Sequence, residues 1–110
     1  MDRSQAKYIG IDGINTRYFE AGDGEPMILI HGGQPGMASS AEIWFLNIDE
    51  LAKKYHIYAL DKLGQGYTDN PKINEDYTMG AQVKHAVGFM NKLNITNAHL
   101  LGHSRGGYMT

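Results

Sequence analysis

The sequence predicts an α/β fold in which a leading β-hairpin is followed by parallel strands that alternate with helices. Two observations support this prediction. Short apolar runs of strand length, residues 27–30 and 56–60, alternate along the chain with helical periodicities, and strands that alternate with helices form a parallel sheet with helices on its faces. Glycines or polar residues follow each run directly, at the carboxyl ends of strands where such sheets carry their active sites.

The chain is expected to open with a hairpin. Residues 8–11 and 14–21 are strand-like runs on either side of Asp12 and Gly13, and Asp-Gly between two strands is a turn signal. Residues 27–30 then form an unbroken apolar run, which suits a strand buried on both faces.

The first helix is expected between this strand and the next one, at residues 56–60. Apolar residues at spacings of four, three and four predict its buried face. These residues are Trp44, Ile48, Leu51 and Tyr55. Ser39 and Glu42, three residues apart, fit a capping box at its start.

A second helix is expected from about Thr78, which is a suitable N-cap. Its predicted buried face consists of Met79, Val83, Ala86, Met90 and Leu93. A short strand at residues 98–101 then leads into Gly102, His103 and Ser104.

Composition narrows the function classes. The chain has 110 residues, a net charge of −2 and no cysteine, which excludes disulfides, thiol catalysis and thiolate metal sites. The small net charge gives no indication of nucleic acid or membrane as a partner. No stretch reads as a signal peptide or membrane span. We therefore expect a cytoplasmic protein that acts on a small-molecule substrate.

The segment 102–106 reads Gly-His-Ser-Arg-Gly, which has the form G-x-S-x-G. This pattern builds a sharp turn from strand into helix that exposes the serine oxygen above the sheet. The apolar strand before it and the additional Gly107 favour Ser104 as a nucleophile. The alternative is a strand-to-helix turn without chemistry.

The segment 31–36 reads His-Gly-Gly-Gln-Pro-Gly and follows the buried strand at 27–30. An oxyanion needs preorganised donors. A backbone N–H from this loop and that of Arg105, the residue after the serine, are suitable donors. A flexible glycine loop without this role is the alternative. A phosphate loop is rejected, because neither G-x-x-x-x-G-K-[ST] nor G-x-G-x-x-G occurs.

Asp61 follows the strand at 56–60 and is more typical of an Asp that accepts hydrogen bonds from amides of its own turn than of a catalytic acid. None of the five histidines is a convincing general base. His31 would orient the glycine loop, and His103 points away from its neighbour at the elbow. The other three are expected to be surface or packed residues: His56, His85 and His99. No metal site is predicted, since no zinc-binding pattern occurs.

In the order of these motifs the sequence resembles the α/β-hydrolase fold superfamily over nearly its whole length. Within that superfamily it looks most like the meta-cleavage-product hydrolases, which cleave a carbon–carbon bond in ring-fission products of aromatic degradation. Their oxyanion loop commonly reads H-G-G-G-P-G, and here it reads H-G-G-Q-P-G. The resemblance implies a serine hydrolase without a cofactor, with Ser104 as nucleophile, amides of Gly33 and Arg105 as the oxyanion hole, and His31 and Gly32 orienting the loop.

Two positions depart from that subfamily. Glu42 stands where its members often carry a substrate-holding Asn, and the elbow reads G-H-S-R-G-G where they often have G-N-S-M-G-G. This elbow is closer to the general esterase and lipase pattern, so carboxylic ester hydrolysis is the alternative activity. Dehalogenases and epoxide hydrolases place Asp at the elbow, and Ser104 argues against them.

The family also places its triad acid and base after the nucleophile. Residues 1–110 are therefore expected to be an incomplete α/β-hydrolase domain without the lid, the last strands, the triad acid and the triad base. Such a chain alone would be inactive, and its final strand would be an unpaired apolar edge. The remaining alternative is a binding or assembly module whose edge is covered by a partner or a second copy, as a homo-oligomer.

Overall fold

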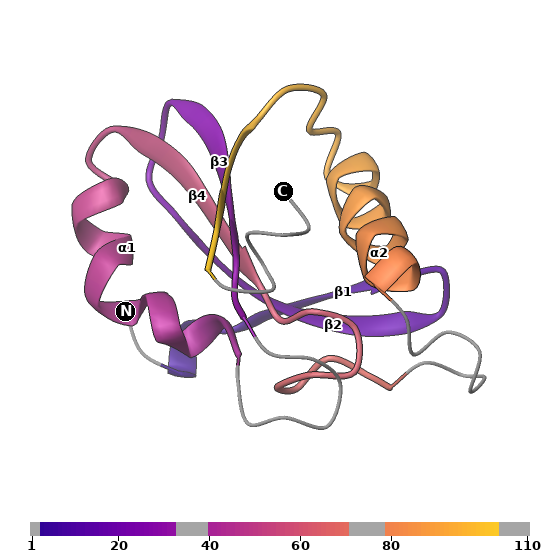
Figure 1. Ribbon diagram of the computed structural model, residues 1–110. Coiled ribbons are helices and arrows are strands. Elements are labelled where there is room, and N and C mark those ends of the chain that lie inside the picture. Colours follow the sequence, from indigo (N-terminus) through magenta and orange to yellow (C-terminus); the bar gives the residue numbers. More distant parts are fainter. Residues whose placement is uncertain (1–2, 33–39, 71–78, 104–110) are drawn as a thin grey trace.

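A computed structural model describes residues 3–32, 40–70 and 79–103, which form a five-stranded sheet with helices on both faces (Figure 1). In chain order the elements are a 3₁₀ turn η1 (Arg3–Gln5), β1 (Lys7–Ile11), β2 (Ile14–Ala21), β3 (Glu25–Ile30), a 3₁₀ turn η2 (Ala41–Trp44), α1 (Phe45–Leu51), β4 (Tyr55–Leu60), α2 (Met79–Lys92) and β5 (His99–Gly102). The strand order is β1-β2-β4-β3-β5. The pairs β1–β2 and β2–β4 are antiparallel, and β3 pairs in parallel with both β4 and β5. The predicted α/β class is confirmed.

The hairpin forms as predicted. Residues Asp12 and Gly13 join β1 to β2 with φ angles of 50° and 81°. A two-residue hairpin turn with positive φ at both positions matches the twist of the strands, and Asp-Gly tolerates that conformation. The turn sets the register that places Ile11 opposite Ile14.

The first helical segment is shorter than the sequence predicts. A 3₁₀ turn begins at Ala41 and α1 ends at Leu51, so Tyr55 belongs to β4 rather than to the helix stripe. The cap is also one residue later than expected, because the side chain of Ser40 accepts a hydrogen bond from the Glu42 amide. Ser39 lies outside the described residues.

The buried face of α2 differs in part from the one predicted. Gln82, His85 and Phe89 are buried, whereas Val83 and Met90 are half-buried. Met90 and Leu93 pack against the apolar layer as predicted, but the prediction missed Gln82 and His85 because these buried side chains are polar. Nε2 of His85 meets the Thr16 hydroxyl on β2 at 2.8 Å, whereas Nδ1 of the same ring is buried without a hydrogen-bond partner among the described residues. Thr78 lies outside the described residues.

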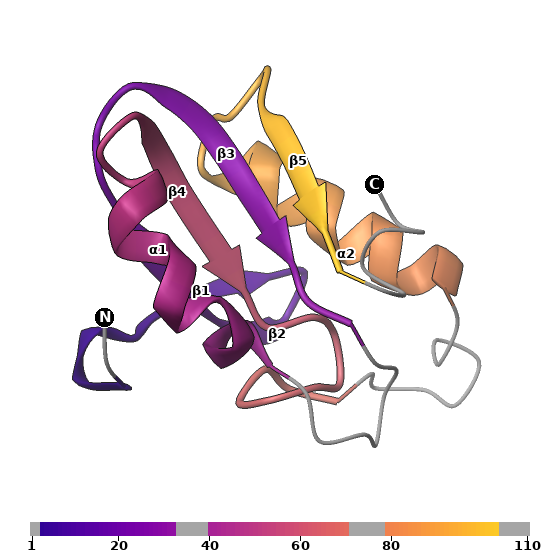
Figure 2. The ribbon, with the colours of Figure 1, turned by 60° about the vertical axis from the view of Figure 1, so that its left-hand side comes forward.

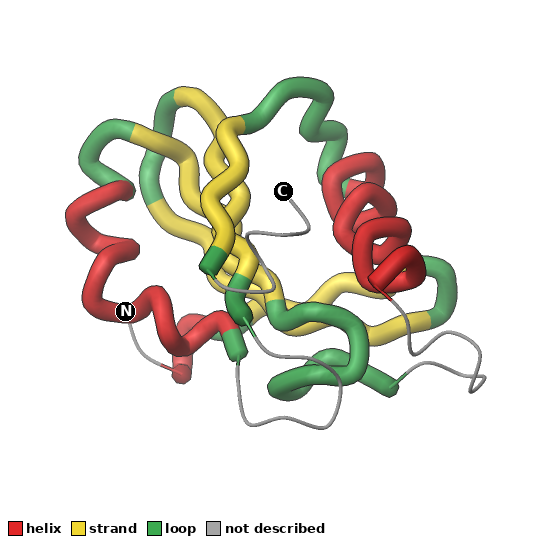
Figure 3. The backbone as a smooth tube through the Cα atoms, viewed as in Figure 1, coloured by secondary structure: helices red, strands yellow, loops and turns green. Residues whose placement is uncertain are grey.

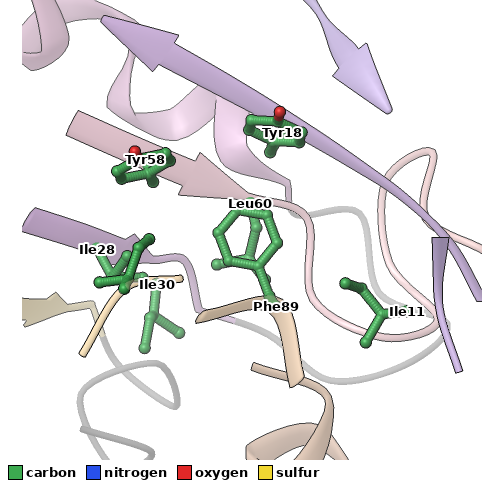
Figure 4. Packing of buried hydrophobic residues seen from close by; sticks show 8 residues of the cluster. Ile11, Tyr18, Ile28, Ile30, Tyr58, Leu60 and Phe89 are labelled. Atoms are coloured by element: carbon green, nitrogen blue, oxygen red, sulfur yellow. The ribbon is translucent and has the colours of Figure 1, made fainter. Parts of the chain in front are cut away.

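The sheet separates two apolar layers, with α1 on one face and α2 on the other (Figure 3). Alternate residues of the central strands point to opposite faces, because side chains alternate along a strand. Toward α2 the layer contains Ile28, Ile30, Tyr58 and Leu60, which surround Phe89 (Figure 4). Toward α1 it contains Phe19, Leu29, Ile57, Ala59 and Ile48.

Strand β5 lies at the edge of the described sheet, beside β3 (Figure 2). It begins at His99, one residue later than predicted. Leu100 and Leu101 are 44% and 40% exposed. In the described part of the chain the predicted apolar edge is therefore present.

Candidate active site

The carboxyl ends of β3, β4 and β5 meet at one edge of the sheet (Figure 2). Ile30 is in register with Leu60 on one side and with Gly102 on the other. The three segments that follow these residues are the three that the sequence predicts to carry chemistry. Parallel pairing therefore brings the starts of the His-Gly loop, the Asp61 loop and the serine turn to one place.

One backbone hydrogen bond joins the first and last of these segments. The amide of His103 donates to the carbonyl of Ile30 over 3.0 Å. His103 precedes Ser104, and Ile30 precedes His31. Ser104, Gly33 and Arg105 themselves lie outside the described residues.

His31, the first residue of the His-Gly segment, is fully buried. Its Nε2 accepts a hydrogen bond from the Lys62 amide over 3.0 Å, and a backbone amide can only donate. In the neutral ring the hydrogen is therefore on Nδ1, which donates to the Gly32 carbonyl over 2.7 Å. Burial lowers the pKa of His31 to about 4 against the opposing bond to Gly32, so the ring is neutral near pH 7.

Gln65 joins the same group of residues, which sequence reasoning missed. Its Nε2 donates to the Gly32 carbonyl over 3.3 Å, so this oxygen receives hydrogen bonds from two side chains. The side chain of Gln65 is 2% exposed. A polar residue flanked by Gly64 and Gly66 was the only signal available in the sequence.

Asp61 is a structural anchor of its loop, as predicted. Its buried carboxylate accepts hydrogen bonds from the Tyr67 amide at 2.8 Å and the Ala41 amide at 2.7 Å. Its backbone carbonyl accepts from the Thr68 hydroxyl at 2.9 Å. One carboxylate thus ties the turn after β4 to the start of η2.

Arg17 of β2 was not singled out from the sequence, yet it completes this anchor. Its Nε donates to Asp61 Oδ2 over 2.7 Å, and a terminal nitrogen donates to Glu42 Oε1 over 2.8 Å. Burial disfavours the charged guanidinium, but the hydrogen bonds to Asp61 and Glu42 outweigh it and hold the pKa of Arg17 above its ordinary value. Glu42 is therefore engaged by an arginine as well as by the helix start.

A family model described as "alpha/beta hydrolase fold" matches residues 25–110. The chain belongs to the α/β-hydrolase fold family. The matched range contains β3, β4 and β5 and all three segments at their carboxyl ends.

Two of the similar curated proteins are hydrolases. The chain is 38% identical to 2-hydroxy-6-oxo-6-(2'-aminophenyl)hexa-2,4-dienoic acid hydrolase of Metapseudomonas resinovorans over 92% of this chain and 34% of that protein. It is 41% identical to 2-hydroxymuconate semialdehyde hydrolase of Pseudomonas sp. strain CF600 over 86% of this chain and 33% of that protein. The α/β-hydrolase chain thus spans about a third of these curated relatives.

Solved structures give the same result. The structure of a variant of the meta-cleavage product hydrolase CumD from Pseudomonas fluorescens IP01, complexed with acetates, superposes with a TM-score of 0.87 at 39% identity. The match covers 98% of this chain and 39% of that one. The resemblance inferred from the motifs is therefore confirmed at the level of the family.

The other histidines of this α/β-hydrolase chain are engaged away from the loop starts. His56 meets Glu20 at 2.5 Å, and His99 meets Glu25 at 2.7 Å at the amino end of β3. Within residues 3–32, 40–70 and 79–103, no group of three histidine or acidic side chains could hold a metal ion. In the same ranges no helix is long and apolar enough to cross a membrane.

Proposed function

We propose that this chain is part of a serine hydrolase that cleaves a carbon–carbon bond in a ring-fission product of the meta-cleavage type. One observation supports the proposal above all: β3 and β5 pair so that Ile30 lies opposite Gly102, which brings together the first residues of the His-Gly segment and of the G-x-S-x-G motif. The similarity to hydrolases of 2-hydroxymuconate semialdehyde and of a hexa-2,4-dienoic acid supports the substrate class.

In this proposal Ser104 is the nucleophile, and the backbone amides of Gly33 and Arg105 stabilise the oxyanion that forms on the substrate carbonyl. Water is the second substrate of the hydrolysis. Its hydroxyl ends on the acyl fragment as a carboxylic acid, and its hydrogen ends on the carbon that leaves. No cofactor enters this chemistry.

His31 and Gly32 serve this site by orienting the loop. Both ring nitrogens of His31 are engaged, with Gly32 and with the Lys62 amide, so the ring is unsuited to accept the serine proton. Asp61 is unsuited as the triad acid, because its carboxylate is bound by Arg17 and by backbone amides. The triad acid and base are therefore expected after Ser104, in the family order of serine, acid and histidine.

The test uses the protein as its gene encodes it. Turnover of 2-hydroxymuconate semialdehyde and of 2-hydroxy-6-oxo-2,4-heptadienoate is followed as loss of the conjugated chromophore. We expect Ser104→Ala to lower kcat by a factor on the order of 10³ or more, and the exposed Ser4→Ala to leave it unchanged. Unchanged turnover in Ser104→Ala would refute the assignment of the nucleophile.

Carboxylic ester hydrolysis is the second candidate activity. The elbow G-H-S-R-G-G favours it, and a membrane phospholipase A is among the similar structures, with a TM-score of 0.84 at 26% identity. Turnover of p-nitrophenyl acetate with no turnover of either ring-fission product would select this candidate. Absence of all three activities would leave the assembly module, for which the exposed edge of β5 is the expected contact surface.

A further inference from the structure

Among the described residues, the side chain of Gln65 makes one hydrogen bond, and it is directed at the peptide that leads into the glycine loop. The amide nitrogen lies 3.3 Å from the Gly32 carbonyl oxygen, and the side chain is 2% exposed. The other side-chain donor to that oxygen, His31, comes from the adjacent residue of the same strand end. Among the described residues, Gln65 therefore contacts this peptide from a different segment, the loop after β4.

The oxygen of the same side-chain amide destabilises the folded protein. Oε1 of Gln65 is buried without a hydrogen-bond partner among the described residues. A buried acceptor without a partner destabilises the folded state, and an apolar side chain of similar shape avoids that penalty. Nε2 of Gln65 thus donates a hydrogen bond, whereas Oε1 has no partner among the described residues. This favours a function for the Nε2 hydrogen bond over a contribution of Gln65 to stability.

The hydrogen bond from Gln65 to the Gly32 carbonyl bears on the orientation of a whole peptide unit. A peptide unit is planar, and a trans unit holds its N–H antiparallel to its C=O. The next residue, Gly33, lies outside the described residues. In a trans unit, a contact that orients the carbonyl of Gly32 would also orient the amide of the following residue.

We propose that Gln65 is a positioning residue for the oxyanion loop, acting through its hydrogen bond to the Gly32 carbonyl. It touches neither substrate nor nucleophile. Its catalytic consequence rests on the hydrolase function proposed above, while its effect on the Gly32 peptide is independent of that function.

The first test compares Gln65→Met with Gln82→Met in the protein as its gene encodes it. Gln82 is 3% exposed on α2, so both changes remove a buried amide, but only one removes a donor to Gly32. Loss of an entire oxyanion donor costs about 10² to 10³ in kcat. Loss of one of two contacts that orient the donor is expected to lower kcat about tenfold in Gln65→Met, with KM within about twofold.

The stability of Gln65→Met distinguishes a positioning role of Gln65 from a role in packing alone. We expect Gln65→Met to unfold in urea at the same concentration as the unsubstituted protein or at a higher one, because it removes the unpaired oxygen. If Gln65→Met lowered kcat and also unfolded at a lower urea concentration than the unsubstituted protein, the proposal would be overturned. An unchanged kcat of Gln65→Met in an active enzyme would overturn it as well. Gln82→Met is expected to leave kcat unchanged.

The conservative variant Gln65→Glu gives a readout that depends on protonation. A carboxylate repels the Gly32 oxygen, whereas a protonated carboxyl donates to it. The kcat of Gln65→Glu divided by that of the unsubstituted protein should therefore rise as the pH falls toward the pKa of the introduced carboxyl. A ratio that does not change with pH would contradict a hydrogen bond to Gly32.

A spectroscopic measurement keeps this proposal separate from the proposed function. In carbon-13 NMR, loss of a hydrogen bond moves the Gly32 carbonyl resonance upfield in Gln65→Met and not in Gln82→Met. If the unsubstituted protein turns over no substrate, the proposed function fails, and this shift still decides the role of Gln65. An unmoved Gly32 resonance would overturn it.

Discussion

The guanidinium of Arg17 and the carboxylate of Asp61 form a buried ion pair, with Nε and Oδ2 2.7 Å apart and side chains 2% and 0% exposed. Arg17 lies on β2, and Asp61 follows β4, so the pair spans neighbouring antiparallel strands. The ring of Tyr67 lies over the guanidinium at 4.4 Å from its centroid. This pair holds the loop that also contains Lys62 and Gln65, which both form hydrogen bonds with the described start of the His-Gly segment.

Removing one partner of this pair should be costly. We expect Asp61→Asn to lower the free energy of unfolding by about 3 to 5 kcal/mol, because it leaves a buried guanidinium without its closest counter-charge. Urea unfolding measures the change. The control is Glu50→Gln, which removes the exposed ion pair with Lys53 and should cost less than about 1 kcal/mol. An Asp61→Asn loss as small as that of the control would show that the pair is not a structural anchor.

A glycine in the same loop is required for steric reasons. Gly66 has a φ of 55°, and a Cβ added there would stand 2.3 Å from Asp61 Oδ2. We expect Gly66→Ala to destabilise the protein by about 2 kcal/mol or more, since both the backbone conformation and the contact resist the change. Gly10→Ala is the matched control, because no atom lies within 4 Å of its added Cβ. Equal unfolding midpoints for the two variants would contradict this account.

The positions of the strands along the chain were predicted from the sequence better than the bounds and buried faces of the helices. The unbroken run in β3 and the Asp-Gly turn after β1 are local signals that packing does not override. Periodicity alone could not place Tyr55, because an apolar residue four after Leu51 fits a helix stripe and also the first position of β4. Tyr55 belongs to the strand because it pairs with Glu25 of β3.

The role of a site residue could be predicted from the sequence where its hydrogen-bond partners are close to it along the chain. It could not be predicted where the partners are far away along the chain. Asp61 was assigned to its turn from the sequence, and the Tyr67 amide bears this out. Arg17 and Gln65 reach across 44 and 33 positions of the chain to their partners, and no local pattern encodes such contacts. Gln82 and His85 were missed on the α2 face because both side chains are polar and yet buried in the tertiary structure.

The ring of Phe89 should be the main apolar contact of α2. It is fully buried and meets Tyr18 and Tyr58 edge to face, with centroids 5.2 and 6.2 Å apart. We expect Phe89→Ala to lower the free energy of unfolding by about 3 to 5 kcal/mol through lost burial and the cavity it leaves. Val87→Ala on the same helix removes a side chain from a residue that is 49% exposed, so it should cost less than about 1 kcal/mol. A comparable loss in the two variants would place the α2 contact elsewhere.

Two buried histidines should make the protein sensitive to mild acid. Burial lowers the pKa of His85 to about 4 despite the opposing charge of Asp12, and burial likewise lowers the pKa of His31 to about 4. The ordinary value is 6.5. Between these values the unfolded chain binds protons that the folded protein excludes, so stability is complete above pH 6.5 and falls as the pH drops toward 4.

The slope of stability against pH tests this linkage. Each histidine contributes up to about 1.4 kcal/mol per pH unit within that window. We expect His85→Met to remove about half of the slope measured by urea unfolding from pH 6.5 to 5, with His31 supplying the rest. Gln82→Met lies on the same helix face and removes no titratable group, so its slope should match that of the unsubstituted protein. If His85→Met kept the full slope, the acid sensitivity would have to arise from groups other than this imidazole.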